Sequence, residues 1–123
     1  MPILGRNYLP IETIIIEEGI THIGKAAFKE NGINEISLPE SLLHVDVEAF
    51  LGNGTITNFP SALNYIGEAA FSRTQINGSI IIKNINIEPR AFSDTKITDV
   101  VFEEGITKIP AYLFSGAKEL KSV

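Results

Sequence analysis

The sequence predicts a mostly β solenoid of about five stacked repeats of 21–23 residues, each with two short strands. Three observations predict it: phenylalanine recurs at an almost constant spacing, aliphatic residues recur at a fixed distance before it, and β-branched isoleucine is unusually frequent. Because a unit of this size cannot bury its apolar face alone, stacking against its neighbours is its only route to a core.

The phenylalanine spacing is the clearest repeat signal. Five of the seven phenylalanines follow one another at intervals of 22, 21, 21 and 22 residues, and alanine precedes the first four of them. They are Phe28, Phe50, Phe71, Phe92 and Phe114. The residues five positions earlier are Ile23, Val45, Ile66, Ile87 and Ile109. Stacked repeats would therefore place the phenylalanine rings in one buried ladder along the spine of the solenoid.

Each repeat is expected to begin with a strand that has one buried face. Apolar residues at Ile33, Ile36 and Leu38 alternate partly with polar ones, as in such a strand. A proline or a Glu-Gly pair then turns the chain, and a second short strand follows, at residues 42–45 in one repeat and 106–109 in the last.

A short turn or 3-10 segment is expected to carry the alanine and phenylalanine inward. Asn-Gly pairs at residues 31–32 and 53–54 then indicate left-handed turns after the phenylalanine. Two repeats depart from the common spacing. If Ile56 is aligned with Ile33, the segment 56–63 is two residues shorter than its counterpart in the repeat that begins at Ile33. The segment 76–87 is one residue shorter. We expect a bulge or a shortened first strand in both.

The repeats make the chain one domain, with repeats at about 11–32, 33–55, 56–75, 76–96 and 97–119. Residues 1–10 are expected to form a partial N-terminal cap, and residues 120–123 to begin an incomplete repeat. An uncapped end leaves unpaired backbone, so edge-to-edge self-association through the C-terminal repeat is a further expectation.

Composition narrows the classes of partner. A net charge of −5 argues against binding to nucleic acid, which requires a basic face. The sequence holds no apolar run of 18 residues, so membrane insertion is not predicted. With no cysteine, neither a disulfide framework nor a thiolate metal site is possible. The first residues show no pattern typical of a signal peptide.

The motif Ile-Gly-x-x-Ala-Phe, followed by a strand that ends in Leu-Pro, resembles the BspA-like leucine-rich repeats of bacterial surface proteins. It stands at residues 23–28 and 66–71, and the resemblance covers residues 11–123. It implies a right-handed leucine-rich-repeat solenoid, extracellular or at the cell surface. It further implies binding to a protein or another macromolecule through the strand face, often within an adhesin, with no catalysis and no cofactor.

One position departs from the family pattern. The family often has cysteine three residues after the phenylalanine, where this chain has mostly small polar residues that can bond the backbone of a turn. The residues at this position are Asn31, Asn53, Thr74, Thr95 and Ala117.

The strand face is the predicted functional surface, because strand surfaces are what solenoids use for binding. Ile15 and Val101 are apolar where solvent is expected, which indicates a contact patch. The alternative is a structural spacer that carries no ligand site of its own. The candidate residues are Thr13, Ile15, Glu35, Ser37, Asn58, Asp99 and Val101, together with the stretch 79–83.

Other constellations are weaker candidates. His22 and His44 share one repeat position, and stacking would place their rings about 5 Å apart. An exposed ladder is the favoured interpretation, since two ligands make a weak zinc or nickel contact and their row adds no carboxylate or thiolate. Ser72, Ser93 and Ser115 form another row without histidine, so no nucleophile is predicted there. No metal or other cofactor is predicted.

Overall fold

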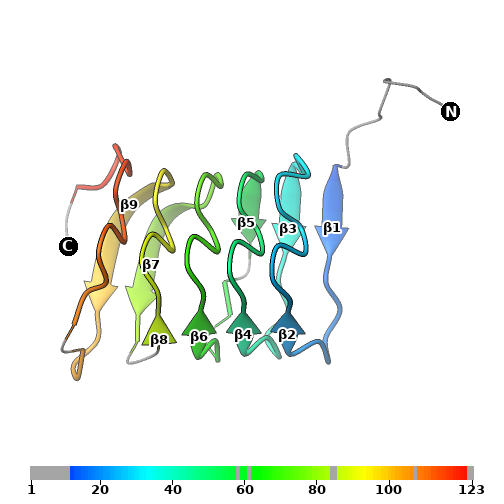
Figure 1. The fold of residues 1–123 in the computed structure, drawn as a ribbon, viewed down its shortest axis with the longest axis horizontal. Helices are drawn as coiled ribbons and strands as arrows, with labels where there is room; N and C mark the ends of the chain where they lie inside the picture. The colour runs from blue at the N-terminus through cyan, green and yellow to red at the C-terminus, as the bar shows by residue number, and fades with distance from the viewer. Residues whose placement is uncertain (1–11, 58, 61, 84–85, 107, 122–123) are drawn as a thin grey trace, which may run out of the picture.

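The computed structural model describes residues 12–57, 59–60, 62–83, 86–106 and 108–121. These residues form a flattened solenoid in which successive strands lie side by side along the long axis (Figure 1). All nine strands of the described part pair in parallel with their neighbours, and that part contains no helix. The predicted mostly β solenoid is confirmed, with two strands in each repeat except the last, where only β9 forms among the described residues.

The strands fall into two rows, one on each side of the flattened coil (Figure 1). The first row contains β1 (Thr13–Ile15), β3 (Glu35–Ser37) and β5 (Thr55–Thr57) in one sheet, with β7 (Asn77–Ile82) and β9 (Lys96–Phe102) in another. The second row is one sheet of β2 (His22–Ile23), β4 (His44–Val45), β6 (Tyr65–Ile66) and β8 (Asn86–Ile87).

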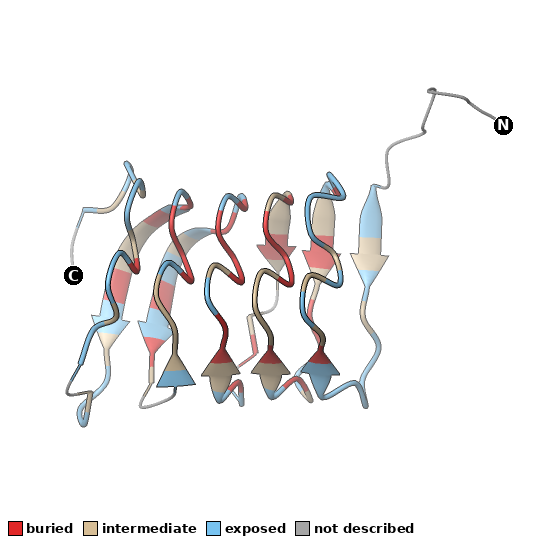
Figure 2. Cartoon of the chain, viewed as in Figure 1, coloured by how far each residue is buried: buried red, intermediate tan, exposed pale blue. Residues whose placement is uncertain are grey.

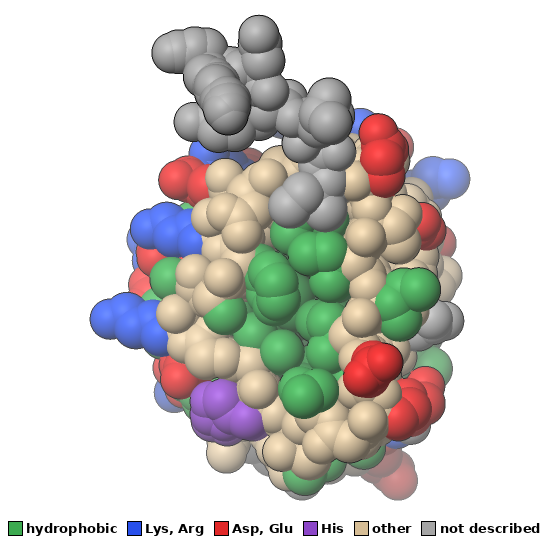
Figure 3. Space-filling model, turned by 90° about the vertical axis from the view of Figure 1, so that its right-hand side faces the viewer, with side chains coloured by type: hydrophobic (Ala, Val, Ile, Leu, Met, Phe, Trp, Pro, Cys, Tyr) green, Lys and Arg blue, Asp and Glu red, His purple; other side chains and the backbone are tan. Residues whose placement is uncertain are grey.

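The phenylalanine ladder forms the spine of the core. Phe50, Phe71 and Phe92 are completely buried, while Phe28 and Phe114 at the two ends are half-buried. Successive rings stack nearly parallel with centroids 5.4–5.8 Å apart, within the range of favourable aromatic pairs. Buried residues therefore concentrate in the middle repeats (Figure 2), and hydrophobic side chains gather at the centre of the cross-section (Figure 3).

The segments around the first four phenylalanines bond to the next repeat without forming a strand. Alternate N–H groups cross to the following repeat, as in the bond from Phe50 N–H to the carbonyl of Ala70 (2.9 Å). The residues two before and two after each phenylalanine all have positive φ, for example Ala69 and Arg73 at 55°. The left-handed residues thus recur in register, and the turn segment continues the hydrogen bonding between repeats.

The position three after the phenylalanine completes these turns. The Thr74 and Thr95 hydroxyls donate to the carbonyls of Phe71 and Phe92 at 2.8 and 2.9 Å. The Asn53 amide donates to two carbonyls and accepts from the N–H of Ile33 (3.0 Å). All three side chains are buried, so these bonds satisfy polar groups that would otherwise be costly. The expected bonding of this row is confirmed at these three residues.

The register of the third repeat differs from the expected alignment. Ile56 pairs with Ile36, so the alignment of Ile56 with Ile33 is wrong. β5 is as long as β1 and β3, and the expected shortening is absent. In the next repeat, β7 is longer, and the expected bulge lies between Gly78 and Ser79.

Gly54 has a different role from the one predicted. Gly32 adopts a positive φ (63°), as predicted, whereas the φ of Gly54 is not positive. Instead, a Cβ at Gly54 would collide with the backbone carbonyl of Asn34 in the preceding repeat. Glycine is required there because two backbones approach closely.

The prediction of a second strand at residues 106–109 is wrong, because the described residues of that stretch form no strand. Ile109 is 55% exposed, although its counterparts Ile23, Val45 and Ile66 are buried. The N–H that follows Val45 and the one that follows Ile66 donate to the previous repeat, from Asp46 to Ile23 and from Gly67 to Val45. Pro110 has no N–H to donate, so the second sheet ends at β8.

Some expectations concern residues outside the described part of the chain. Residues 1–10, predicted to form a cap, and Asn58 are among them, as are residues 122–123. Within the described part, the N–H of Lys121 donates to the carbonyl of Thr98 (2.6 Å), so hydrogen bonding between repeats extends past the fifth phenylalanine.

Replacing the central phenylalanine should strongly destabilise the solenoid. Phe71 is fully buried with a stacked ring on each side, so Phe71→Ala should lower the free energy of unfolding by roughly 3–5 kcal/mol. Urea denaturation measures this cost. Val101→Ala, at an exposed position, is the control and should change it by less than about 0.5 kcal/mol. A cost below 1 kcal/mol for Phe71→Ala would contradict a buried ladder.

Adjacent alanines should respond to glycine in opposite directions. Ala69 has φ of 55°, so Ala69→Gly should raise the free energy of unfolding by roughly 0.5–1 kcal/mol. Ala70 is fully buried without positive φ, and Ala70→Gly should lower it by roughly 1–2 kcal/mol. Thermal and urea denaturation of the two variants make the comparison, and equal destabilisation by both would argue against the left-handed turn.

Candidate functional site

The strand face consists of the outward side chains of β1, β3, β5, β7 and β9. Side chains alternate along these strands, so residues such as Ile14, Ile36 and Val100 pack inward while their neighbours face solvent. Parallel pairing then arranges the outward residues in rows across the sheets. These residues are Thr13, Ile15, Glu35, Ser37, Thr55, Thr57, Ser79, Ile81, Asp99 and Val101.

Most of the sequence-predicted residues lie on this face. Thr13 pairs with Glu35 and Ile15 with Ser37 on neighbouring strands. Asp99 and Val101 lie on β9, where they pair with residues of the predicted 79–83 stretch. The exception is Asn58, which lies outside the described residues.

Thr55 and Thr57 belong to the face but were not predicted. They pair with Glu35 and Ser37, and the misaligned register of Ile56 concealed them. Alternation around Ile56 alone would have placed both outward, because Ile56 is buried. The face over β1, β3 and β5 is therefore largely polar, apart from Ile15.

An apolar patch lies on the other sheet of the face. Ile81 of β7 and Val101 of β9 are direct partners across the sheet, and each is 55% exposed. Ser79 and Asp99, also partners, lie beside them, and the Asp99 carboxylate accepts a hydrogen bond from the Thr98 hydroxyl (2.8 Å). Two adjacent β-branched side chains thus form a small apolar centre with polar neighbours.

A groove adjoins this patch where the strand row is interrupted. β5 and β7 belong to separate sheets, and the intervening chain inserts Phe59 against Phe71 and Phe92, with ring centroids 5.4 and 5.9 Å apart. The groove has a volume of about 270 Å³ and a mostly apolar lining. Its walls are Phe59, Pro60, Leu63, Ser79, Ile80, Ile81 and Lys83.

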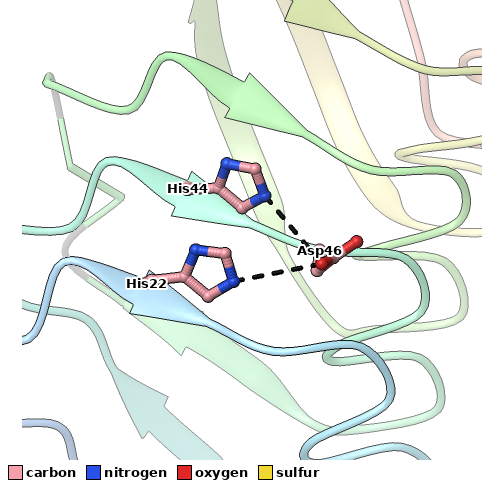
Figure 4. Close-up of side chains that lie close together, drawn as sticks. All are labelled: His22, His44 and Asp46. Atoms are coloured by element: carbon pink, nitrogen blue, oxygen red, sulfur yellow. Dashed lines mark ion pairs between the residues drawn. The ribbon is translucent and has the colours of Figure 1, made fainter.

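The two histidines lie in the second sheet, away from the strand face. His22 and His44 are paired residues of β2 and β4, with ring centroids 4.2 Å apart, as their shared repeat position predicted. The Asp46 carboxylate lies beside both rings (Figure 4). Counting equivalent repeat positions missed Asp46, because it comes from the adjoining segment rather than from the histidine row.

Two pKa shifts oppose catalytic use of the groups concerned. The pKa of Lys29 is raised because its ammonium donates a hydrogen bond to the Glu48 carboxylate (2.9 Å) and is attracted by its charge. Burial raises the pKa of Tyr65, and the charges of Glu88 and Asp46 add to the effect. A nucleophilic lysine or tyrosine requires the opposite shift.

The serine row forms an internal contact. The hydroxyls of Ser72 and Ser93 are hydrogen-bonded to one another at 2.7 Å, and both side chains are buried. Ser115 is exposed at the end of the row. Buried hydroxyls that satisfy each other support stacking of the repeats rather than attack on a substrate.

Comparison with known families identifies the repeat. The model of the BspA type leucine rich repeat region matches six copies over residues 6–121, where the phenylalanine spacing counts five. Comparisons with curated proteins and with solved structures gave no match. Among the described residues, no helix has the length and hydropathy needed to cross a membrane. This repeat family suggests a protein-interaction module, and it is typically non-enzymatic. Because the match spans nearly the whole chain, the protein belongs to the BspA-type leucine-rich repeat family.

Proposed function

We propose that this chain is a non-enzymatic protein-binding module whose strand face contacts the partner, with Ile81 and Val101 as the central anchor. The observation that carries the proposal is their direct pairing at 55% exposure beside an apolar groove. Protein interfaces favour such an arrangement, with a desolvated apolar centre inside a polar rim. The partner expected is a protein segment that presents an aliphatic or aromatic side chain to the groove.

The surroundings of the anchor support a protein partner. Ser79 and Asp99 provide polar groups next to the apolar pair, and Lys83 is among the residues that line the groove. The net charge of −5 disfavours a nucleic-acid backbone at this face. We extend the proposal to adhesion by an extracellular or cell-surface protein, because repeats of this family are common in surface proteins.

Loss of the apolar pair should weaken binding without unfolding the chain. The double variant Ile81→Ser/Val101→Ser should bind at least tenfold more weakly to a protein first isolated with the wild type from an extracellular-matrix extract. Surface plasmon resonance measures the affinity, and a circular-dichroism melt checks the fold. The matched control is Ile20→Ser/Leu43→Ser, which removes two partly exposed aliphatic residues elsewhere and should leave binding unchanged.

The same experiment separates binding from the spacer alternative. If the strand-face variant binds as well as the wild type, the strand face does not contact the partner, and the binding site lies elsewhere on the chain. A spacer role is favoured if the wild type itself retains no protein from the extract. If the control loses affinity to the same extent, the contact lies near Ile20 and Leu43 instead.

Self-association through the C-terminal repeat is a second proposal, and it rests on exposed apolar side chains. Ile109 and Tyr112 are 55% and 63% exposed on the last described repeat. Sedimentation velocity at high protein concentration should show dimers, and Ile109→Glu should shift the distribution to monomers. A strict monomer for the unmodified chain at the highest concentration would contradict this proposal.

A further inference from the structure

We propose that His22, His44 and Asp46 form a binding site for a divalent transition-metal ion of the zinc and nickel type. Each residue offers one ligand atom, and all three atoms lie within 4.8 Å of one another. The Nε2 atoms of His22 and His44 are 3.9 and 4.0 Å from the same Asp46 oxygen, Oδ2. Figure 4 shows both rings with a nitrogen directed toward this carboxylate.

The parallel register holds the two imidazoles in place. Pairing of β2 with β4 sets His22 beside His44, and the rings are nearly parallel, with 13° between their planes. Tyr65, the next residue in the row, stacks on the other side of His44 with a centroid distance of 4.4 Å. His44 therefore lies between two stacked rings, which limits its side chain to small rotations.

The backbone positions the carboxylate. Asp46 Oδ1 accepts a hydrogen bond from the N–H of Val47 at 2.7 Å, while its own N–H donates to the Ile23 carbonyl (3.0 Å). One carboxylate oxygen is thus engaged, and Oδ2 is the one that faces the histidines. Fixing one oxygen of a ligating carboxylate is a common way of orienting the other toward a metal.

The distances between the histidine nitrogens and the Asp46 oxygen fit a cation placed between these atoms better than direct hydrogen bonds between them. Oδ2 is almost equidistant from the two Nε2 atoms and too far from either for a hydrogen bond. A tetrahedral zinc ion would draw the three ligand atoms to separations of roughly 3.3 Å. The side chains of His22, His44 and Asp46 are 53%, 35% and 34% exposed, so small rotations can achieve this.

The donor set selects the metal class. Two imidazole nitrogens and one carboxylate oxygen suit zinc, nickel or copper, whereas calcium and magnesium require mainly oxygen ligands. Three protein ligands at an exposed position leave the remaining coordination sites to water. The histidines lie at the rim of the molecule (Figure 3), where an ion and its waters have access.

Isothermal titration of the full chain with ZnCl₂ and, separately, with NiCl₂ tests the site. One ion per chain with micromolar or tighter affinity is expected, and CaCl₂ should give no signal. His22→Gln, His44→Gln and Asp46→Asn should each weaken binding at least tenfold. Asp46→Asn keeps the acceptor for Val47, so it separates ligation from the backbone contact. Asp94→Asn removes the same charge from an exposed position elsewhere and should leave affinity unchanged.

Nuclear magnetic resonance supplies an independent readout. Ni²⁺ should broaden the imidazole signals of both histidines at substoichiometric amounts, while signals from the β9 region stay sharp. The site is refuted if zinc does not bind at millimolar concentration, or if Asp46→Asn costs no more affinity than Asp94→Asn. A stoichiometry of half an ion per chain would also overturn it, because the ion would then bridge two molecules.

Discussion

Hydrogen bonding between successive repeats is the constraint on which the rest of the structure depends. A repeat of this size has no core of its own, so each backbone must bond to the repeats beside it. Parallel pairing in constant register then places equivalent residues next to one another, as with His22, His44 and Tyr65. A residue type that recurs in the sequence consequently becomes a row in space. The phenylalanine ladder and the buried Asn and Thr side chains are consequences of that register.

The sequence predicted those features that depend on equivalent positions alone. Constant spacing was enough to place the phenylalanine rings in a spine and the two histidines in contact. It could not reveal Asp46, whose equivalents Gly24, Gly67 and Glu88 do not form a row of acids. The contact of Asp46 with both histidines depends on how the chain turns after β4, and Val47 contributes to that turn through its N–H.

The errors in register share a physical origin. The repeats were aligned by matching apolar residues in the sequence. The pairing of repeats in the structure depends instead on which backbone N–H groups can donate hydrogen bonds. Asn53, three residues after Phe50, is buried although it is polar, because its amide bonds the neighbouring turns and accepts from the N–H of Ile33. At Pro110 the error ran the other way. The apolar Ile109 before it suggested a strand, but Pro110 has no N–H with which to bond that strand to the previous repeat.

Regular repetition supplies stability, while the departures from it supply the features that a ligand could recognise. The rows over β1, β3 and β5 are largely polar, with Thr13, Glu35 and Thr55 in one and Ile15, Ser37 and Thr57 in the other. Where Phe59 separates β5 from β7, the face gains a groove and an apolar pair. The histidine–aspartate cluster arises from another departure, a single acid beside a histidine pair, and it lies in a different sheet.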